Sequence, residues 1–516
     1  MLNRLMASAA GTLLLVLLPL TAVAQPGEPY RLGNCQALQA STTHTRTIHT
    51  TERAPASDRA EAHCRVTGQI LPEVGFEVRL PDNWNGHFLM LGNAGFAGEI
   101  QAFVQGGFAP YLRQGFVVAA TDTGHDADRQ PLASFGVDRQ KVIDFAYRAV
   151  HVTTHAAKDL VAAYYGSGPE LSYFRGGSTG GRQGLMAAQR FPADFDGILV
   201  AFPVLDQTNH HLASIQIMQA MEEAPIHMNQ LETLAKRVYA RCDDIDGVED
   251  GLIAEPIRCD FDPAENLPRC DGRVAHPTCF TEGQIGTLQV LYSDVNSQGK
   301  TIMPGQPVGA SAQGRVVGPF APYVGSGWNP YLVNQSGLPF RLQGSASFLR
   351  YMAFDAPRPN FDWRDFDIDA DPSRIQWIRT VLDATDPDLS AFRDRGGKLL
   401  MYFGWADAGP NPRMGTRYYE AVRDTMGAST PDFFRLFMIP GMFHGNGGIG
   451  TPRVQAFAAL RAWAETDTPP NRLTISYHED GEVVRTRPAC PYPKMARPTN
   501  SGPTTDAENF ECVAPR

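Results

Sequence analysis

The sequence predicts an α/β fold in which a large inserted segment interrupts the sheet-forming part of the chain. Three observations support this class. Apolar runs of strand length alternate with helical patterns up to about residue 203, the alternation stops over residues 204–371, and it returns near residue 398. Such alternation is typical of a mostly parallel sheet covered by helices. We expect a sheet domain formed by residues 25–203 and 372–516, with residues 204–371 as an inserted lid domain.

Seven short runs bounded by turn residues are expected to be strands. They span residues 76–80, 87–91, 115–122, 171–174, 197–201, 398–403 and 433–439. Helical patterns are expected over residues 142–165, 182–190 and 454–463. The tail from about residue 487 is rich in proline, so it is expected to lack regular structure.

The charge balance excludes one class of partner. The 516 residues carry 45 Lys and Arg against 55 Asp and Glu, which gives a net charge of −10. A protein that binds nucleic acid needs a basic face for the phosphates, and the sequence has no run of basic residues. The expected partner is a small molecule, and 43% hydrophobic residues are enough for a large core.

The first 24 residues have the pattern of a secretory signal peptide. Arg4 precedes an apolar run, and Ala22-Val-Ala24 offers small residues for cleavage before Gln25. A membrane anchor is the alternative, but the apolar run is short for a bilayer span. We expect cleavage after Ala24, export to the periplasm or the medium, and no membrane span in the mature protein.

The eight cysteines are expected to form structural disulfides, because an exported protein meets an oxidising environment. Their even number and clustering disfavour a zinc site or a catalytic thiol. The sequence does not fix the connectivity, but the cysteines fall into local pairs: Cys35 with Cys64, Cys242 with Cys259, Cys270 with Cys279, and Cys490 with Cys512.

Ser178 is the candidate nucleophile. Gly176 and Gly180 give it a G-x-S-x-G setting, a predicted strand precedes it and a predicted helix follows it. This strand–turn–helix context is typical of a nucleophile elbow, in which the glycines allow the turn that exposes the serine hydroxyl. A glycine-rich loop without catalytic function is the alternative.

Two later residues complete a catalytic set. Asp407 follows a predicted buried strand, and His444 lies in the loop after the next strand. A serine hydroxyl needs an imidazole to accept its proton, and the imidazole needs a buried carboxylate to orient it. The order Ser178, Asp407, His444 is the nucleophile–acid–base order of α/β hydrolases, so we predict an α/β-hydrolase fold.

The predicted oxyanion hole has one donor beside the serine and one on an early loop. The backbone N–H of Thr179 follows the nucleophile, and the glycine-rich residues 92–98 leave a core strand. In this fold the second donor comes from such a loop, and Gly95 is the candidate. A plain hairpin loop is the alternative.

An acidic loop at residues 242–253 reads Cys-Asp-Asp-Ile-Asp-Gly-Val-Glu-Asp-Gly-Leu-Ile. Hard cations such as Ca²⁺ prefer carboxylate and carbonyl oxygens on a folded loop of this kind, although the spacing is not that of an EF-hand. A solvated acidic turn is an equal alternative. Elsewhere in the insertion, aromatic residues either line an aryl-binding pocket or form an ordinary core: Phe320, Tyr323, Trp328, Tyr331 and Phe340.

The whole mature chain resembles the tannase/feruloyl esterase family of α/β hydrolases. The matching stretches are Trp84-Asn-Gly86 with residues 92–98, Ser178-Thr-Gly-Gly-Arg-Gln-Gly184, the acidic loop, Gly404-Trp-Ala-Asp407, Pro440-Gly-Met-Phe-His444 and Cys490-Pro-Tyr-Pro493. The resemblance implies an esterase with Ser178, Asp407 and His444 as its triad. It also implies a structural calcium ion in the acidic loop, bound by Asp243, Asp246, Val248, Asp250 and Leu252, which would brace the lid.

One departure from this resemblance concerns the catalytic loops. Many members of the family have cysteines just before the nucleophile and just after the base, joined by a disulfide. This chain has Gly177 and Gly445 at these positions. Because both cysteines are missing together, we expect a coherent active variant of the family whose loops lack a covalent tie.

These inferences predict a secreted serine esterase that hydrolyses aromatic carboxylic esters of the feruloyl or hydroxycinnamoyl type through an acyl-enzyme on Ser178. A tannase that acts on galloyl esters and a mono(hydroxyethyl) terephthalate hydrolase are the alternatives within the class. From a different class, the chain could be a calcium-braced binding protein on a degenerate hydrolase scaffold. The complete Ser–Asp–His set disfavours that alternative.

Overall fold

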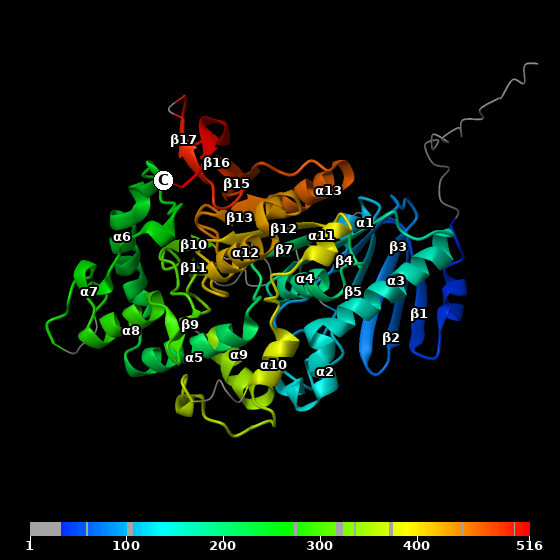
Figure 1. The fold of residues 1–516 in the computed structure, drawn as a ribbon, viewed down its shortest axis with the longest axis horizontal. Coiled ribbons are helices and arrows are strands. Elements are labelled where there is room, and N and C mark those ends of the chain that lie inside the picture. The colour runs from blue at the N-terminus through cyan, green and yellow to red at the C-terminus, as the bar shows by residue number, and fades with distance from the viewer. Residues whose placement is uncertain are drawn as a thin grey trace, which may run out of the picture.

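The structure is a computed structural model that describes residues 32–57, 60–100, 107–272, 276–315, 324–334, 337–370, 375–445, 447–499 and 501–515 (Figure 1). The predicted signal peptide lies outside these residues, as do Phe320 and Tyr323 of the candidate aromatic set. Within the described part of the chain, no helix is both long and apolar enough to cross a membrane.

A nine-stranded mixed sheet forms the centre of the molecule, in the order β1-β2-β3-β5-β4-β6-β7-β12-β13. The first three strands and β5 pair antiparallel, in the order β1-β2-β3-β5. The remaining pairs, in the order β5-β4-β6-β7-β12-β13, are parallel. The strands are β1 (Arg46–Ala54), β2 (His63–Ile70), β3 (Val74–Pro81), β4 (His87–Leu91), β5 (Val117–Thr121), β6 (Leu171–Gly177), β7 (Gly197–Ala201), β12 (Lys398–Gly404) and β13 (Phe434–Ile439). The predicted α/β class and all seven predicted strands are confirmed, and β1 and β2 add an antiparallel edge that was not predicted.

Helices cover both faces of this sheet. Adjacent residues of a strand point to opposite faces. Tyr173 of β6 contacts Phe457 of α13 (Ala456–Thr466), whereas Phe174 packs against Gly184 of α4 (Thr179–Arg190). The helices α4 and α13 therefore lie on opposite faces. On the face of α4 lies α3 (Ala149–Tyr165), and α12 (Arg413–Met426) contacts β12 and β13.

The helix predicted over residues 142–165 is interrupted by a π-helical turn. It consists of α2 (Arg139–Ile143), the π turn Asp144–Arg148 and α3, and it ends at Gly166 with a φ of 82°. The fully buried Arg182 of α4 donates hydrogen bonds to the carbonyl oxygens of Phe145 and Ala146 in this turn. A π turn leaves carbonyl groups without their usual helical partners, and Arg182 supplies donors for two of them.

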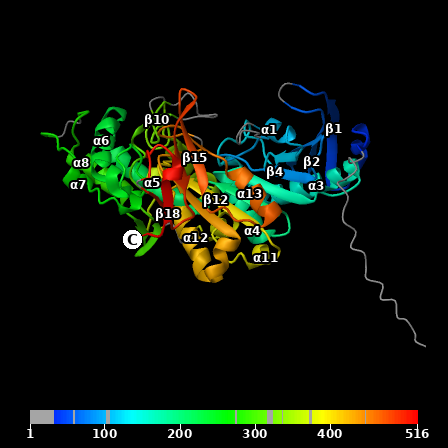
Figure 2. The same cartoon turned by 90° about the horizontal axis from the view of Figure 1, so that it is seen from above.

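Residues between β7 and β12 form a separate group of helices, which lies to the left of and below the sheet in Figure 1 and again to the left in Figure 2. They bury a second hydrophobic core. The helices are α5 (Gln207–Glu223), α6 (Leu231–Cys242), α7 (Pro263–Asn266), α8 (Glu282–Tyr292), α9 (Phe340–Phe348) and α10 (Gln376–Leu382). The short helix α11 (Ser390–Asp394) also lies between β7 and β12 in sequence, but its Phe392 packs in the core of the sheet. Two hairpins accompany them: β8 (Val295–Ser297) with β9 (Lys300–Met303), and β10 (Gln313–Arg315) with β11 (Val324–Ser326).

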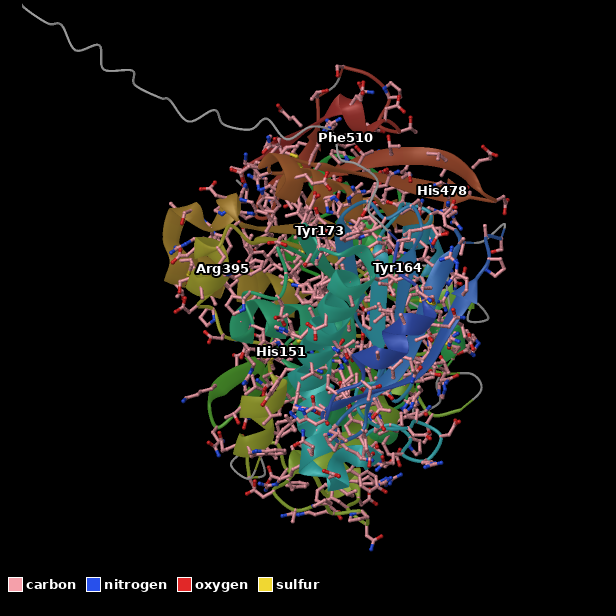
Figure 3. The ribbon with its side chains drawn as sticks, turned by 90° about the vertical axis from the view of Figure 1, so that its right-hand side faces the viewer. His151, Tyr164, Tyr173, Arg395, His478 and Phe510 are labelled. Atoms are coloured by element: carbon pink, nitrogen blue, oxygen red, sulfur yellow. A yellow bond between two sulfur atoms is a disulfide. The ribbon has the colours of Figure 1, made fainter. Side chains whose placement is uncertain are left out.

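The prediction that the C-terminal tail lacks regular structure is wrong. The tail contains the end of β16 (Glu482–Ala489) and the paired strands β17 (Met495–Pro498) and β18 (Phe510–Val513). Before it, β14 (Pro452–Val454) and β15 (Leu473–Glu479) pair with each other, and β15 also pairs with β16. Pro488 stands near the end of β16 and Pro498 at the end of β17, where a strand tolerates a missing N–H donor. Figure 3 places His478 of β15 and Phe510 of β18 at one edge of the molecule.

Two predicted helix starts also differ from the structure. The helix after the elbow starts at Thr179, not at residue 182, because the turn is confined to Ser178. The last helix starts at Ala456, because Val454 pairs with Ile475 at the end of β14.

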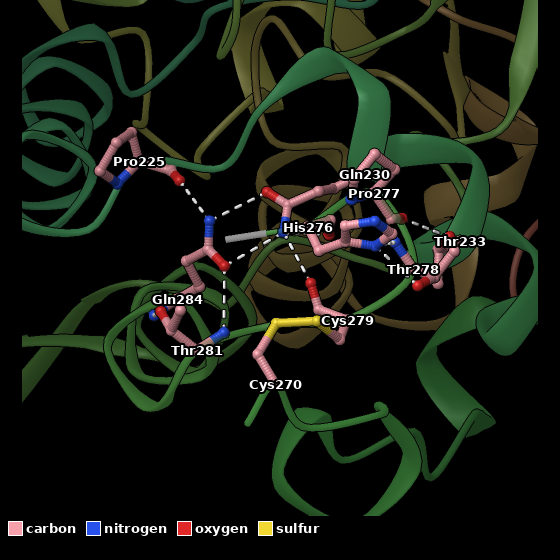
Figure 4. The surroundings of a disulfide bond; sticks show 10 residues. All are labelled: Pro225, Gln230, Thr233, Cys270, His276, Pro277, Thr278, Cys279, Thr281 and Gln284. Carbon is pink, nitrogen blue, oxygen red and sulfur yellow. Dashed lines mark hydrogen bonds between the residues drawn. A yellow bond between two sulfur atoms is a disulfide. The ribbon is translucent and has the colours of Figure 1, made fainter. Parts of the chain in front are cut away.

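All eight cysteines form disulfides, and the four bridges join the local pairs named above. Two of them, Cys242–Cys259 and Cys270–Cys279, lie in the inserted segment. Figure 4 shows how the second is supported, since the side-chain amide of Gln230 donates to the carbonyl of Cys279 and to Gln284. The bridges fit an extracellular protein, and the N-terminus predicts export to the periplasm or the medium.

Candidate active site

Ser178 occupies a sharp turn between β6 and α4. Its φ of 58° and ψ of −121° lie outside the regions that non-glycine residues ordinarily adopt. Backbone hydrogen bonds hold this conformation, because the Ser178 N–H donates to Ala201 at 3.0 Å and the Arg182 N–H donates to the Ser178 carbonyl at 3.1 Å. Strain of this kind persists only where surrounding contacts enforce it, and a nucleophile elbow is one such place.

Asp407 and His444 form a buried pair. The loop after β12 carries Asp407 and the loop after β13 carries His444, and the Nδ1 of His444 lies 2.9 Å from Oδ2 of Asp407. The other carboxylate oxygen accepts the N–H of Gly409 at 2.7 Å. The aspartate side chain is fully buried and that of the histidine is 9% exposed. Because Nδ1 is engaged, Nε2 is the imidazole nitrogen that can accept a proton.

The glycine-rich loop lies directly against the elbow. The N–H of Gly180 donates to the carbonyl of Asn93 at 2.8 Å, and the hydroxyl of Thr179 donates to the carbonyl of Gly95 at 2.6 Å. Gly95 has a φ of 54°, and an added Cβ would meet no atom within 4 Å. The two residues predicted to form the oxyanion hole, Thr179 and Gly95, are therefore in direct contact.

Two aromatic rings flank the imidazole of His444. The Phe202 ring meets it at a centroid distance of 4.8 Å and the Tyr331 ring at 5.4 Å, both edge to face. Tyr331 belongs to the predicted aromatic set, and burial raises the pKa of its hydroxyl. Trp328, by contrast, is 1% exposed and belongs to the core of the insertion. Sequence reasoning missed Phe202, because a phenylalanine after a buried strand resembles any core residue.

Arg341 of α9, in the segment between β7 and β12, contacts the loop that carries Asp407. Its Nε and Nη2 donate to the carbonyl of Gly409, and Nη2 also donates to Oε1 of Gln306 at 3.0 Å. The Gln306 amide in turn donates to the carbonyl of Asp407 at 2.5 Å. Burial lowers the pKa of Arg341 to about 10, while the charge of Asp407 acts in the opposite direction. No sequence motif indicates this chain of contacts.

The adjacent histidines of α5 have different surroundings. His211 is buried, its ring stacks on Phe96 and Phe348, and its Nδ1 lies 3.0 Å from the Ser345 hydroxyl. Burial lowers the pKa of His211 to about 3. Burial and the charges of Arg341, His211 and His444 lower the pKa of His210.

The acidic loop folds around its own carboxylates. Asp243 accepts the N–H of Gly251, Asp246 accepts that of Val248 at 3.0 Å, and Asp250 accepts that of Leu252 at 3.1 Å. Asp250 also pairs with Arg485 and Arg487 of β16. Burial and the charge of Asp250 raise the pKa of Asp246 to about 6.

This loop lies closer to the catalytic centre than its sequence position indicates. A Cβ added to Gly441 would meet the Leu252 side chain at 2.6 Å, and Gly441 precedes His444 by three residues. The acidic loop therefore packs against the base loop.

His151, His155 and Asp194 form a second group that could hold a metal ion, with ligand atoms within 4.8 Å of one another. Both imidazoles hydrogen-bond the Asp194 carboxylate, at 2.8 and 3.2 Å. The group lies beyond the C-terminal end of α4, whereas Ser178 precedes its N-terminal end, and Figure 3 shows His151 on α3. The ammonium of Lys158 donates to the Asp194 carbonyl, so a cation already lies beside the group.

The α/β fold together with comparison with known sequences defines the class of the protein as a carboxylic ester hydrolase and names the family. Residues 59–513 match the family described as tannase and feruloyl esterase, so the chain belongs to this family. An uncharacterized esterase of Xanthomonas campestris is 35% identical, with 88% of this chain and 85% of the relative covered. A mono(2-hydroxyethyl) terephthalate hydrolase of Piscinibacter sakaiensis is 31% identical, with 90% and 87% covered.

Comparison of the structure gives the same family. The crystal structure of feruloyl esterase B from Aspergillus oryzae matches with a TM-score of 0.81 at 25% identity, and the match covers 93% of this chain and 99% of that one. Feruloyl esterase B of Aspergillus niger is 29% identical in sequence, over 87% of this chain and 86% of the relative.

Proposed function

We propose that the protein is an exported serine esterase that hydrolyses esters of aromatic carboxylic acids through an acyl-enzyme on Ser178. One set of contacts carries the proposal most directly: the imidazole of the buried Asp407–His444 pair and the residue before the strained Ser178 both lie against the ring of Phe202. The four disulfides and the signal-like N-terminus support export.

The proposed reaction has two steps. Nε2 of His444 accepts the hydroxyl proton of Ser178 as Oγ attacks the ester carbonyl, and the N–H groups of Thr179 and Gly95 stabilise the oxyanion. The C–O bond to the alcohol breaks, and the alcohol leaves with the proton from His444. A water molecule then attacks the acyl-enzyme with the same base, which releases the aromatic acid and restores Ser178. Asp407 fixes the imidazole and stabilises its protonated form.

Aromatic substrates are supported by an aromatic ring at the base and by the named relatives. Tyr331 offers an aromatic ring beside His444, which suits an aryl group by offset or edge contact. Among the relatives, feruloyl esterase B and mono(2-hydroxyethyl) terephthalate hydrolase carry aromatic acyl groups in their names. We favour the feruloyl type, with galloyl and terephthalate monoesters as the alternatives.

A turnover panel tests this proposal. Purified protein and the Ser178→Ala variant are assayed with methyl ferulate, methyl gallate and mono(2-hydroxyethyl) terephthalate. The proposal expects turnover of at least one aromatic ester, with methyl ferulate preferred, and loss of all turnover in Ser178→Ala without a change in melting temperature. Turnover of short aliphatic esters alone would contradict the aromatic specificity, and an active Ser178→Ala variant would contradict the mechanism.

We also propose that the acidic loop binds a structural Ca²⁺. The donors would be the carboxylates of Asp243, Asp246 and Asp250 with the carbonyl oxygens of Val248 and Leu252, an all-oxygen set that suits a hard cation. The raised pKa of Asp246 supports this fit, because a buried carboxylate with acidic neighbours is stabilised by a cation. Arg485 and Arg487 already offset part of the charge of Asp250. The bound ion would brace this loop against the base loop.

A further inference from the structure

Phe202 is fixed to the nucleophile by the backbone on both sides of it. The carbonyl of Ala201 accepts the N–H of Ser178 at 3.0 Å, and the N–H of Val204 donates to the carbonyl of Ser178 at 3.3 Å. The two residues between these contacts, Phe202 and Pro203, are therefore tied to the elbow through the backbone on both sides. The N–H of Phe202 donates to the carbonyl of Tyr402 in the neighbouring strand at 2.7 Å.

The backbone of Phe202 is itself unusual. Its φ is 36°, in the left-handed region that bulky residues rarely adopt. Such a conformation costs free energy and persists only where surrounding contacts enforce it, and conformations of this kind cluster at functional sites.

The ring of Phe202 touches both catalytic loops. A Cβ added to Gly177 would lie 2.6 and 2.7 Å from two carbons of the ring, so the ring occupies the space above the residue before the nucleophile. The same ring meets the His444 imidazole at 4.8 Å with an interplanar angle of 70°. On a third side it contacts the Tyr402 ring at 5.9 Å, and the residue is only 8% exposed. One side chain therefore fills the gap between elbow and base.

We infer that Phe202 is a positioning residue that sets the spacing between Ser178 and His444 by packing. The inference rests on the proposed function of these two residues. A nucleophile and its base must keep their separation within a fraction of an ångström, and a displacement of about 1 Å costs on the order of 100-fold in rate. The packing of the Phe202 ring also requires glycine at position 177, because a larger side chain there would collide with the ring.

The test measures how fast Ser178 reacts with a fluorophosphonate, since this reaction needs the nucleophile and base but no specific ester. We compare wild type, Phe202→Ala, Phe202→Leu, Gly177→Ala and the Gly177→Ala/Phe202→Ala double variant. Phe202→Ala is expected to lower the second-order labelling rate about 10- to 100-fold, and Phe202→Leu less. In ester hydrolysis kcat should fall while KM changes little.

Coupling between the two positions gives the sharpest readout. Gly177→Ala should slow labelling because its methyl group displaces the ring toward the imidazole. Once the ring is removed, the same methyl group has room. The double variant should therefore label within about twofold of Phe202→Ala, whereas independent effects would multiply.

Phe195→Ala is the matched control. Phe195 is also a buried aromatic residue, but it precedes β7, whereas Phe202 follows it, and its ring packs on Phe174. This variant should lower the melting temperature and keep the wild-type labelling rate. Equal labelling rates for folded Phe202→Ala, Phe202→Leu and wild type, or multiplicative effects in the double variant, would overturn the inference. Failure of the wild type to label at all would instead overturn the proposed serine chemistry together with this inference.

Discussion

The base loop and the acidic loop pack against each other through Gly441 and Leu252, yet different contacts hold them in place. The acidic loop starts at a disulfide-bonded residue, Cys242, and ion pairs link it to β16. The base loop contains no cysteine, and its histidine is held by one hydrogen bond and two aromatic edges.

This difference indicates which property each region controls. Packing and hydrogen bonds fix the catalytic groups to within the small tolerance that catalysis needs, so changes there should affect rate more than stability. A disulfide and ion pairs hold the acidic loop as part of the framework, so changes there should affect stability more than rate.

The largest expected loss of rate follows from a change to the hydrogen bond between Asp407 and His444. Asp407→Asn should lower kcat about 10³- to 10⁴-fold, because the amide no longer enforces the tautomer with a free Nε2 or stabilises the imidazolium. Steady-state kinetics on an aryl ester measure this. Asp388→Asn, a change at an exposed aspartate, is the control and should retain activity. A loss of less than tenfold for Asp407→Asn would remove Asp407 from the proposed triad.

A smaller loss of rate is expected from the insertion. Arg341→Met removes the donors to the Gly409 carbonyl and should lower kcat about 10- to 100-fold, because the loop that carries Asp407 loses these hydrogen bonds. Arg350→Met is the matched control, because Arg350 follows α9 and donates to the carbonyl of Phe361. If both variants keep the wild-type kcat, Arg341 of the insertion does not position Asp407.

Removal of calcium should distinguish the two regions, because it should lower stability while leaving the catalytic rate nearly unchanged. Chelation should lower the melting temperature by several degrees and change kcat at 25 °C by less than about threefold. A ligand present at 100 times its Kd stabilises the folded state by about 2.7 kcal/mol. Calorimetry with and without Ca²⁺ measures this, and Asp246→Asn should abolish the response. A melting temperature that is independent of Ca²⁺ would contradict the proposed site.

The smallest expected effect is on the pH dependence of stability and concerns Asp122, which contacts the glycine-rich loop. The carbonyl of Asp122 accepts the N–H of Gly98 in the glycine-rich loop, and burial raises the pKa of its carboxyl to about 7. Between pH 4 and 7 the folded state keeps a proton that the unfolded state has lost, so this group lowers stability as pH rises. Asp122→Asn should make the fall in melting temperature over this range shallower. An unchanged slope would show that Asp122 does not titrate there.

The sheet, the turn at Ser178 and the positions of Asp407 and His444 after their strands were predictable from sequence, because buried strands and a G-x-S-x-G turn leave local signals. Phe202 and Arg341 were not, because a phenylalanine after a strand and an arginine in an irregular segment acquire their roles only through contacts distant in sequence. The packing of Leu252 on Gly441 is of the same kind. The tail strands were missed because proline is compatible with strand ends, which composition alone does not reveal.

The most direct test of the central claim is to locate the fluorophosphonate label by mass spectrometry. Wild-type protein is reacted with the probe while its activity on an aryl ester is followed, and it is then digested and mapped. The Ser178→Ala variant is treated in the same way. The account predicts a single modification on Ser178, at a stoichiometry that matches the loss of activity, and none in the Ser178→Ala variant. A label on another residue, or an unlabelled and fully active wild type, would contradict the assignment of Ser178 as the nucleophile.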